Sequence, residues 1–321
     1  MTDQLKNEYD VVVAGGGAAG LSGALMLGRA RRSVLVIDAG TPRNAPAEAV
    51  HGFLSRDGIN PAELLKTGRA EIEGYGGQVV PGEAVAAARE GERFSVTLAD
   101  GRQVFARRLL VTTGLVDELP EVAGLRERWG HDVLHCPYCH GWEVRDQALG
   151  VLGGGPMALH QTLLLRQWSA DVTLFSHTAA PPSGDEAEQL AARSIKVVPG
   201  EVESLEIVDD HLTGVRLHDG TVVARQALLV ATRLMARSAL LTTLGLETTA
   251  HPMGVGEYIA SDEAGLTAVP GVWVAGNVTD LIAQVSGAVA GGAFAGAAIN
   301  ADLITEDTRL AVETHRERNH D

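Results

Sequence analysis

The sequence predicts an α/β protein with two nucleotide-binding domains, the second inserted in the first. Residues 11–27 and 149–165 share one pattern, in which an apolar run leads through a glycine turn into an apolar helix. Each is followed by an Asp-Gly turn between alternating runs, which is typical of a β-hairpin. The 321 residues are enough for two domains that each bury a core. We assign 1–116 and 241–321 to the outer domain and 117–240 to the inserted domain.

The first glycine turn, Gly15-x-Gly17-x-x-Gly20, lies between an apolar strand and the helix that follows it. In such a turn the first glycine permits a tight bend, the second lets a pyrophosphate approach the backbone, and the third lets helix pack on strand. The next strand, 34–37, ends in Asp38, where a carboxylate can bind ribose hydroxyls. We therefore expect a Rossmann-like domain with a bound dinucleotide.

The second glycine turn is not equivalent to the first. It reads Gly153-x-Gly155-x-x-Ala158, and the strand after it, expected over 171–175, ends in Ser176-His177-Thr178. This segment offers neither a carboxylate for a ribose diol nor a cation for a 2′-phosphate. The sequence thus predicts that the fold is kept, and it disfavours a bound nicotinamide cofactor.

A third strand-like run, 272–275, ends at Gly276-Asn277 and leads into an Ala- and Gly-rich segment. Between Asp280 and Asp302 there are 21 residues without charge, which is long enough to span a bilayer. Ala and Gly contribute little transfer energy, and glycines let another backbone approach closely. We expect a close-packed buried helix here and no membrane span.

Charge and composition exclude several classes of partner. Lys and Arg number 26 against 41 Asp and Glu, so the net charge is −15, which opposes binding to nucleic acid and to anionic membranes. Aromatic residues make up only 4%, which argues against a base-stacking surface. Residues 1–10 lack the basic and apolar regions of a secretory signal, so we expect a cytoplasmic protein.

The only two cysteines, Cys136 and Cys139, form a C-x-x-C flanked by His135 and His140. This spacing allows a small disulfide ring, and a neighbouring imidazole can lower a thiol pKa or accept a thiol proton. A zinc site that also uses His131 is one alternative, although the second ligand cluster usual in structural zinc sites is missing. An inert buried pair is another alternative. We interpret the pair as a redox-active dithiol and expect no metal.

Together these motifs resemble the low-molecular-weight thioredoxin reductase family over almost the whole chain. The motifs that carry the resemblance are Gly15–Gly20, Thr112-Thr113-Gly114, the C-x-x-C, Gly153–Ala158 and Gly276-Asn277. The resemblance implies two Rossmann-like domains of this type, FAD and a homodimer. It implies that Cys139 faces the flavin and that Cys136 meets the substrate. The residues it implies for FAD are Gly15, Gly17, Ala19, Gly20, Asp38, Thr113, Gly114, Gly276, Asn277, Gln284 and Val285.

Three departures from the reductases change the expected activity. His140 and Asn277 each stand where the reductases carry Asp, and no Arg-rich segment follows the strand at 171–175. This combination is similar to the dithiol oxidases of gliotoxin and holomycin, which use FAD and O2 without NADPH. The resemblance implies a dithiol oxidase that closes an intramolecular disulfide in a small natural-product dithiol, with a holomycin-like dithiolopyrrolone favoured, and that forms H2O2.

In this interpretation the catalytic residues are Cys136, Cys139 and His140, with His135 as the other candidate base. The alternative enzyme is a thioredoxin reductase fed by NADPH or ferredoxin, in which electrons run in the opposite direction. A non-enzymatic alternative is a flavoprotein whose dithiol senses oxidants.

Overall fold

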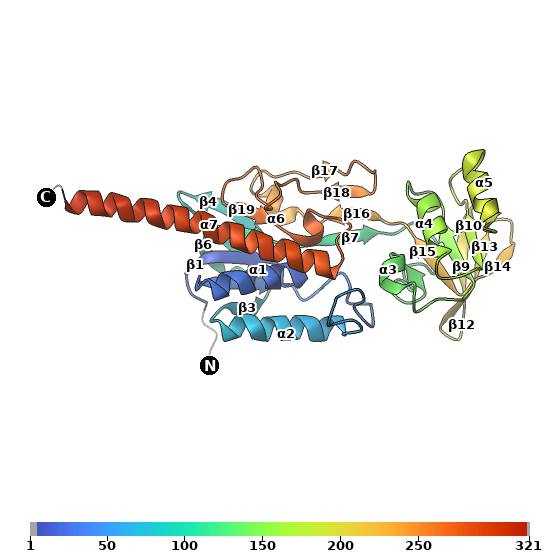
Figure 1. Ribbon diagram of the computed structural model, residues 1–321, viewed down its shortest axis with the longest axis horizontal. Helices are drawn as coiled ribbons and strands as arrows, with labels where there is room; N and C mark the ends of the chain where they lie inside the picture. Colours follow the sequence, from blue (N-terminus) through green and yellow to red (C-terminus); the bar gives the residue numbers. More distant parts are fainter. Residues whose placement is uncertain (1–4, 320–321) are drawn as a thin grey trace.

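The computed structural model describes residues 5–319 and consists of two α/β units joined by a pair of strands (Figure 1). The outer unit carries both described ends of the chain, and the inserted unit lies at the far end of the molecule (Figure 1). The predicted α/β class with a second nucleotide-binding unit inside the first is confirmed. The domain boundaries themselves stay a prediction.

The outer unit is built on a seven-stranded sheet in the order β3-β2-β1-β6-β5-β4, with β19 paired to β6. Strands β1, β2 and β6 run parallel, so their carboxyl ends meet at one edge. The strands are β1 (Glu8–Ala14), β2 (Val34–Asp38), β3 (Gln78–Pro81), β4 (Ala84–Glu90), β5 (Arg93–Leu98), β6 (Gln103–Val111) and β19 (Val272–Val274).

One strand differs from the prediction. The sequence suggests a short hairpin strand at 103–105 and a separate strand from 109, but β6 runs unbroken through both. Its first half pairs antiparallel with β5 and its second half pairs parallel with β19. Residues 106–108 read Ala-Arg-Arg and contain no turn former, so the chain continues from one pairing into the next.

Helices α1 (Ala18–Arg29) and α7 (Val285–Arg318) pack closely against each other. A Cβ added at Gly292 would lie 2.0 Å from the Ala19 carbonyl oxygen, so only glycine permits this contact. By length and composition α7 could cross a membrane, and it is the one described helix that meets this test. The contact with α1 agrees with the expected close packing, but the expectation of a buried helix is wrong. Small residues let one face pack on α1, whereas other residues of the uncharged stretch, such as Phe294 at 70% exposure, face outward. The other outer helices are α2 (Pro61–Gly74), α6 (Ala239–Thr242) and the 3₁₀ turn η1 (Gly276–Val278).

The inserted unit contains a five-stranded parallel sheet in the order β11-β10-β9-β15-β8 and a three-stranded antiparallel sheet. The Asp219-Gly220 turn joins two strands of the latter, as predicted. The parallel strands are β8 (Val133–Leu134), β9 (Leu149–Leu152), β10 (Val172–Phe175), β11 (Lys196–Val198) and β15 (Ala227–Val230). The others are β12 (Val202–Val208), β13 (His211–Leu217) and β14 (Val222–Ala224). The helices are α3 (Pro137–His140), α4 (Ala158–Leu165) and α5 (Asp185–Ala192).

The chain passes between the two units through β7 (Leu115–Glu118) and β16 (Arg233–Ala236), which pair antiparallel. Strands β18 (Gly256–Tyr258) and β17 (Thr249–Ala250) extend this pair into a four-stranded sheet that the sequence did not predict. These strands are only two to four residues long, too short for an alternating pattern to show.

Candidate functional site

A cavity of about 400 Å³ lies at the carboxyl edge of β1, β2 and β6 and extends to the C-x-x-C. This volume falls within the usual range for small-molecule and cofactor sites. All the residues that the sequence assigns to FAD line this cavity, except Gly20. Cys136, Cys139 and His140 line it too. The fold therefore brings the predicted cofactor residues and the predicted dithiol together around one space.

The first glycine turn leaves room for a phosphate group. Gly15 has φ +110°, and a Cβ there would lie 2.5 Å from the Thr112 carbonyl oxygen. A Cβ on Gly20 would lie 1.9 Å from the Gly15 carbonyl oxygen, so Gly20 serves packing, as its place in the motif predicts. A Cβ on Gly17, by contrast, would meet nothing within 4 Å. This open space at the N-terminus of α1 fits a pyrophosphate.

Asp38 is fixed at the cavity edge by three donors. Its Oδ1 accepts hydrogen bonds from the backbone N–H groups of Gly16 and Gly40, each at 3.2 Å. Its Oδ2 lies 2.5 Å from an Arg69 guanidinium nitrogen. Arg69 lies on α2 and no sequence motif predicts it, because the contact joins elements 31 residues apart. The carboxylate is thus held where the motif predicts an adenosine ribose.

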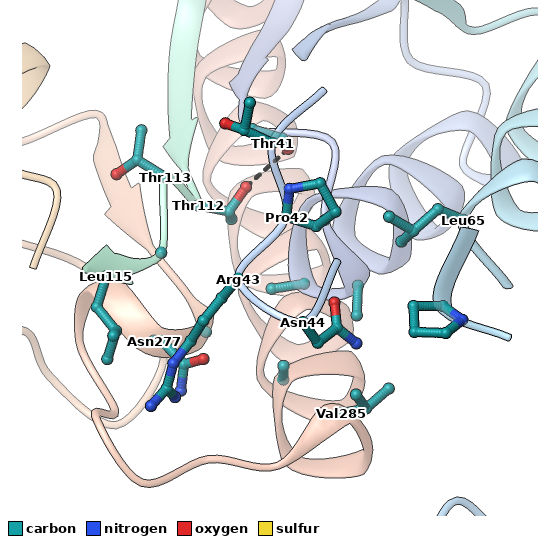
Figure 2. Close-up of a pocket in the computed structure, with 18 of the residues that line it drawn as sticks. Thr41, Pro42, Arg43, Asn44, Leu65, Thr112, Thr113, Leu115, Asn277 and Val285 are labelled. Atoms are coloured by element: carbon teal, nitrogen blue, oxygen red, sulfur yellow. Dashed lines mark hydrogen bonds between the residues drawn. The ribbon is translucent and has the colours of Figure 1, made fainter. Parts of the chain in front are cut away.

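A partly buried ion pair closes another part of the cavity. Arg43 reaches across it from the loop after β2 (Figure 2) and makes two hydrogen bonds of 2.7 Å to the Asp117 carboxylate on β7. The Thr232 hydroxyl also donates to Asp117, at 2.7 Å. Burial alone would raise the pKa of Asp117, but the hydrogen bonds and charge of Arg43 hold it below its ordinary value. This network ties the outer unit to both connecting segments, and sequence reasoning missed it.

Asn277 lines the cavity, but its amide nitrogen serves the backbone. It donates to the carbonyl oxygens of Asp280 and Ala283, both at 2.9 Å. These bonds shape the loop that ends at Gln284, the residue that caps α7. Asn277 therefore positions the start of α7, in addition to lining the space that the resemblance assigns to the flavin.

The two cysteines are joined in a disulfide with their Cα atoms 5.3 Å apart. The 400 Å³ cavity described above is the inner cavity, and Cys139 lines it. Cys136 lines both this inner cavity and a second space, the outer cleft. Besides Cys136 and Gln284, the outer cleft is lined by Gly52, Tyr138, Ile282, Ser286 and Gly287. None of these residues carries a charge. Tyr138 and Ile282 are two-thirds exposed, so the cleft offers apolar surface beside one sulfur.

The two candidate bases differ in their surroundings. Burial, reinforced by the nearby Arg43 charge, lowers the pKa of His135 to about 4. Its Nδ1 is buried without a hydrogen-bond partner among the described residues, so it is free to meet a cofactor atom in the cavity. Burial also lowers the pKa of His140 from 6.5, opposed by the charge of Glu143. Both imidazoles are therefore neutral at pH 7.

The second glycine turn differs from the first in its backbone and in its ligand groups. Its positive φ, +100°, lies at Gly154, and α4 begins five residues after Gly153, whereas α1 begins three residues after Gly15. A Cβ on Gly153 would lie 2.5 Å from the Phe175 carbonyl oxygen, so a side chain is excluded here as it is at Gly15. After β10, His177 Nδ1 accepts a hydrogen bond from the Val202 N–H, and burial lowers the His177 pKa. The segment from 176 to 192 contains no Arg or Lys.

Within residues 5–319, no three His, Cys, Asp or Glu side chains are grouped so that they could hold a metal ion. The sulfurs of the C-x-x-C are bonded to each other. The described residues thus give no ligand group that supports the alternative of a zinc site at His131, His135, Cys136, Cys139 and His140.

The chain is similar to known proteins over nearly its whole length. The thioredoxin reductase tcpT of Claviceps purpurea is 32% identical over 317 residues, covering 94% of this chain and 96% of that protein. The thioredoxin reductase sirT of Leptosphaeria maculans is 28% identical and covers 93% and 95%. The crystal structure of HlmI has a TM-score of 0.91 at 48% identity and covers 98% of both chains. These relatives confirm the resemblance to thioredoxin-reductase-like disulfide oxidoreductases.

The family model for pyridine nucleotide-disulphide oxidoreductases matches residues 9–292, which include both glycine turns, the disulfide and the start of α7. This chain therefore belongs to the pyridine nucleotide-disulphide oxidoreductase family and is an oxidoreductase that acts on thiols and disulfides.

Proposed function

We propose that this protein is an FAD-dependent dithiol oxidase that closes an intramolecular disulfide in a small natural-product dithiol. A dithiolopyrrolone of the holomycin type is the favoured substrate, O2 the acceptor and H2O2 the second product. The observation that carries the proposal is the position of the Cys136–Cys139 disulfide between the inner cavity and the uncharged outer cleft. A substrate in the outer cleft meets Cys136, and a cofactor in the inner cavity meets Cys139.

Membership of this family implies a flavin, and the residues present fit FAD. The open space over Gly17, the fixed Asp38 carboxylate and the orphaned Nδ1 of His135 are the features that a dinucleotide with a ring system would fill. When bound, FAD takes two electrons from the reduced dithiol and gives them to O2. The protein's own part is to hold the disulfide between the two spaces.

The proposed exchange at the disulfide takes place in two steps. A substrate thiolate attacks Cys136 Sγ, the Cys136–Cys139 bond breaks, and its electron pair goes to Cys139 as a thiolate. The second substrate thiolate attacks the substrate sulfur bound to Cys136. The cyclic disulfide leaves, and Cys136 becomes a thiolate.

His140 is the better base for the thiol protons. A group that holds protons only below a pH of about 4, as His135 does, is poorly matched to a reaction near neutrality. His140 is the last residue of α3, and its backbone N–H donates to the Cys136 carbonyl oxygen at 3.2 Å. It is neutral and lines the same cavity as both sulfurs.

NADPH has no place in this proposal. The lack of Arg and Lys in the segment after β10, from 176 to 192, supports its absence, whereas the names of the relatives favour the rival activity, a thioredoxin reductase. The deciding experiment supplies the FAD-loaded enzyme with a reduced dithiolopyrrolone in air and measures O2 uptake, H2O2 and the cyclic disulfide. Catalytic formation of all three is expected. NADPH-driven reduction of thioredoxin, without O2 uptake on dithiols, would overturn the proposal.

A further inference from the structure

Gln284 lies at the boundary between the two spaces that meet at the disulfide. It lines both the inner cavity and the outer cleft, and Cys136 is the other residue that does so. Its Nε2 lies 3.5 Å from Cys139 Sγ and 3.7 Å from Cys136 Sγ. One amide thus contacts both sulfurs from a segment 145 residues further along the chain.

The backbone of Gln284 is fixed at the start of α7, close to the disulfide. Its backbone caps α7, and its carbonyl oxygen accepts the Ala288 N–H at 2.9 Å. The carbonyl of the preceding residue, Ala283, accepts from Asn277 at 2.9 Å. The amide oxygen lies on the side of Gly52, where an added Cβ would be 3.8 Å from it, and the amide nitrogen lies on the side of the sulfurs.

A disulfide sulfur accepts hydrogen bonds weakly, whereas a thiolate accepts them strongly because the acceptor is charged. A donor already in place gains strength only when the bond opens, and a donor of that kind lowers the barrier. We propose that Gln284 donates its Nε2–H to the thiolate that forms on Cys139 when the disulfide is attacked, and then to the thiolate on Cys136 when the product leaves.

This inference rests on the proposed exchange at Cys136 and adds a catalytic residue to it. In this exchange the substrate sulfur bonds to Cys136, the Cys136–Cys139 bond breaks, and the electron pair stays on Cys139. Gln284 transfers no proton. It stabilises the negative charge that develops on the leaving sulfur through a hydrogen bond.

The test uses Gln284→Met, which keeps the length of the side chain but removes the donor, and Gln284→Glu, which keeps the shape but places a negative charge beside the sulfurs. Gln189→Glu is the matched control, because it makes the same change on an exposed face of α5. Each FAD-loaded variant is reduced anaerobically with dithiothreitol. The pH dependence of cysteine alkylation by iodoacetamide is then followed by mass spectrometry.

We expect the alkylation midpoint to rise by about one pH unit in Gln284→Met, and disulfide opening by dithiothreitol at pH 7 to slow about tenfold. Gln284→Glu should shift further in the same direction, and Gln189→Glu should match the wild type. The groups that also line the cavity near the sulfurs, His135, His140 and His51, are unchanged in all variants. A difference in midpoint or opening rate between the variants is therefore caused by the change at residue 284.

Wild-type midpoints and opening rates in both Gln284 variants would overturn the inference. If one variant loses FAD, the other carries the test. The readout does not depend on O2, so it separates this inference from the proposed function. A wild type that consumes no O2 with small dithiols would refute the oxidase proposal, and a shifted midpoint in Gln284→Met would still establish the hydrogen bond.

Discussion

The two glycine turns of this chain both join a buried strand to a helix, but they differ in backbone conformation and in the side chains around them. After β2 the outer unit places Asp38, held by Arg69 and two backbone N–H groups. After β10 the inserted unit places a buried serine and a histidine bonded to the Val202 N–H. A glycine turn between a strand and a helix therefore indicates the fold. The residue at the end of the next strand indicates which ligand the unit can bind.

A substitution in the dithiol is expected to have the largest effect on turnover, because all electrons pass through the dithiol in the proposed reaction. Cys139→Ser removes the sulfur that the proposal places toward the cofactor. We expect it to lower turnover by about 10³-fold or more, as for other members of a catalytic unit, while FAD stays bound. O2 uptake with a dithiol and the flavin spectrum measure the two effects. Full activity in this variant would refute the exchange scheme.

Placing the same charge in both turns tests their difference directly. Gly17→Asp puts a carboxylate into open space, so the fold is kept but the pyrophosphate is repelled by about 4 kcal/mol at close range. FAD affinity should fall by roughly 10²- to 10³-fold, measured by titrating apoprotein with FAD.

Gly155→Asp makes the corresponding change in the inserted unit, where the added Cβ would lie 3.0 Å from the Ala231 Cβ and needs a small local shift. Dithiol oxidation should stay within about twofold of the wild type, because no ligand phosphate is proposed there. Thermal melts of both variants check that the fold survives. Equal losses in the two variants would mean that both turns bind a dinucleotide.

In the proposed reaction, we expect His140 to set the acid limit of the rate. Because burial lowers its pKa, the neutral form persists as the pH falls below 6.5, and the rate should decline only at lower pH. His140→Gln should lower turnover by about 100-fold and remove this limb, whereas His135→Gln should leave it in place. Turnover rates from pH 4 to 9 provide the comparison. If His135→Gln removes the limb instead, the roles of the two imidazoles are reversed.

Asp38 gives the smallest expected effect. Asp38→Asn should weaken FAD binding by about tenfold, since it removes a charged acceptor for the ribose but keeps the shape. Arg69→Gln leaves that acceptor in place and should weaken binding less. If Arg69→Gln costs as much as Asp38→Asn, then the carboxylate matters for its position rather than for a contact with the cofactor.

The parts of the molecule that the sequence predicts are those with a local signal. Both glycine turns, both Asp-Gly hairpins and the C-x-x-C depend on residues a few positions apart, and the structure has them where they are expected. The predicted cofactor residues line one cavity because parallel strands bring their carboxyl ends to one edge.

The features that sequence reasoning missed join residues far apart. Arg43 and Asp117 are 74 residues apart, and Gln284 reaches cysteines more than 140 residues away. No spacing rule predicts such pairs, because they arise only when the two units close around the cavity. The sheet of β7, β16, β17 and β18 was missed for a related reason, since its strands are too short to show a period.

The most direct test of the central claim is anaerobic reduction of the FAD-loaded enzyme by two donors in parallel. One sample receives excess NADPH and the other a small dithiol such as dithiothreitol, and the visible flavin band is followed in each. We expect the dithiol alone to bleach the band, and air to restore it with formation of H2O2. Prompt bleaching by NADPH would contradict the claim, and it would show that the inserted unit binds a nicotinamide cofactor without the cations expected for it.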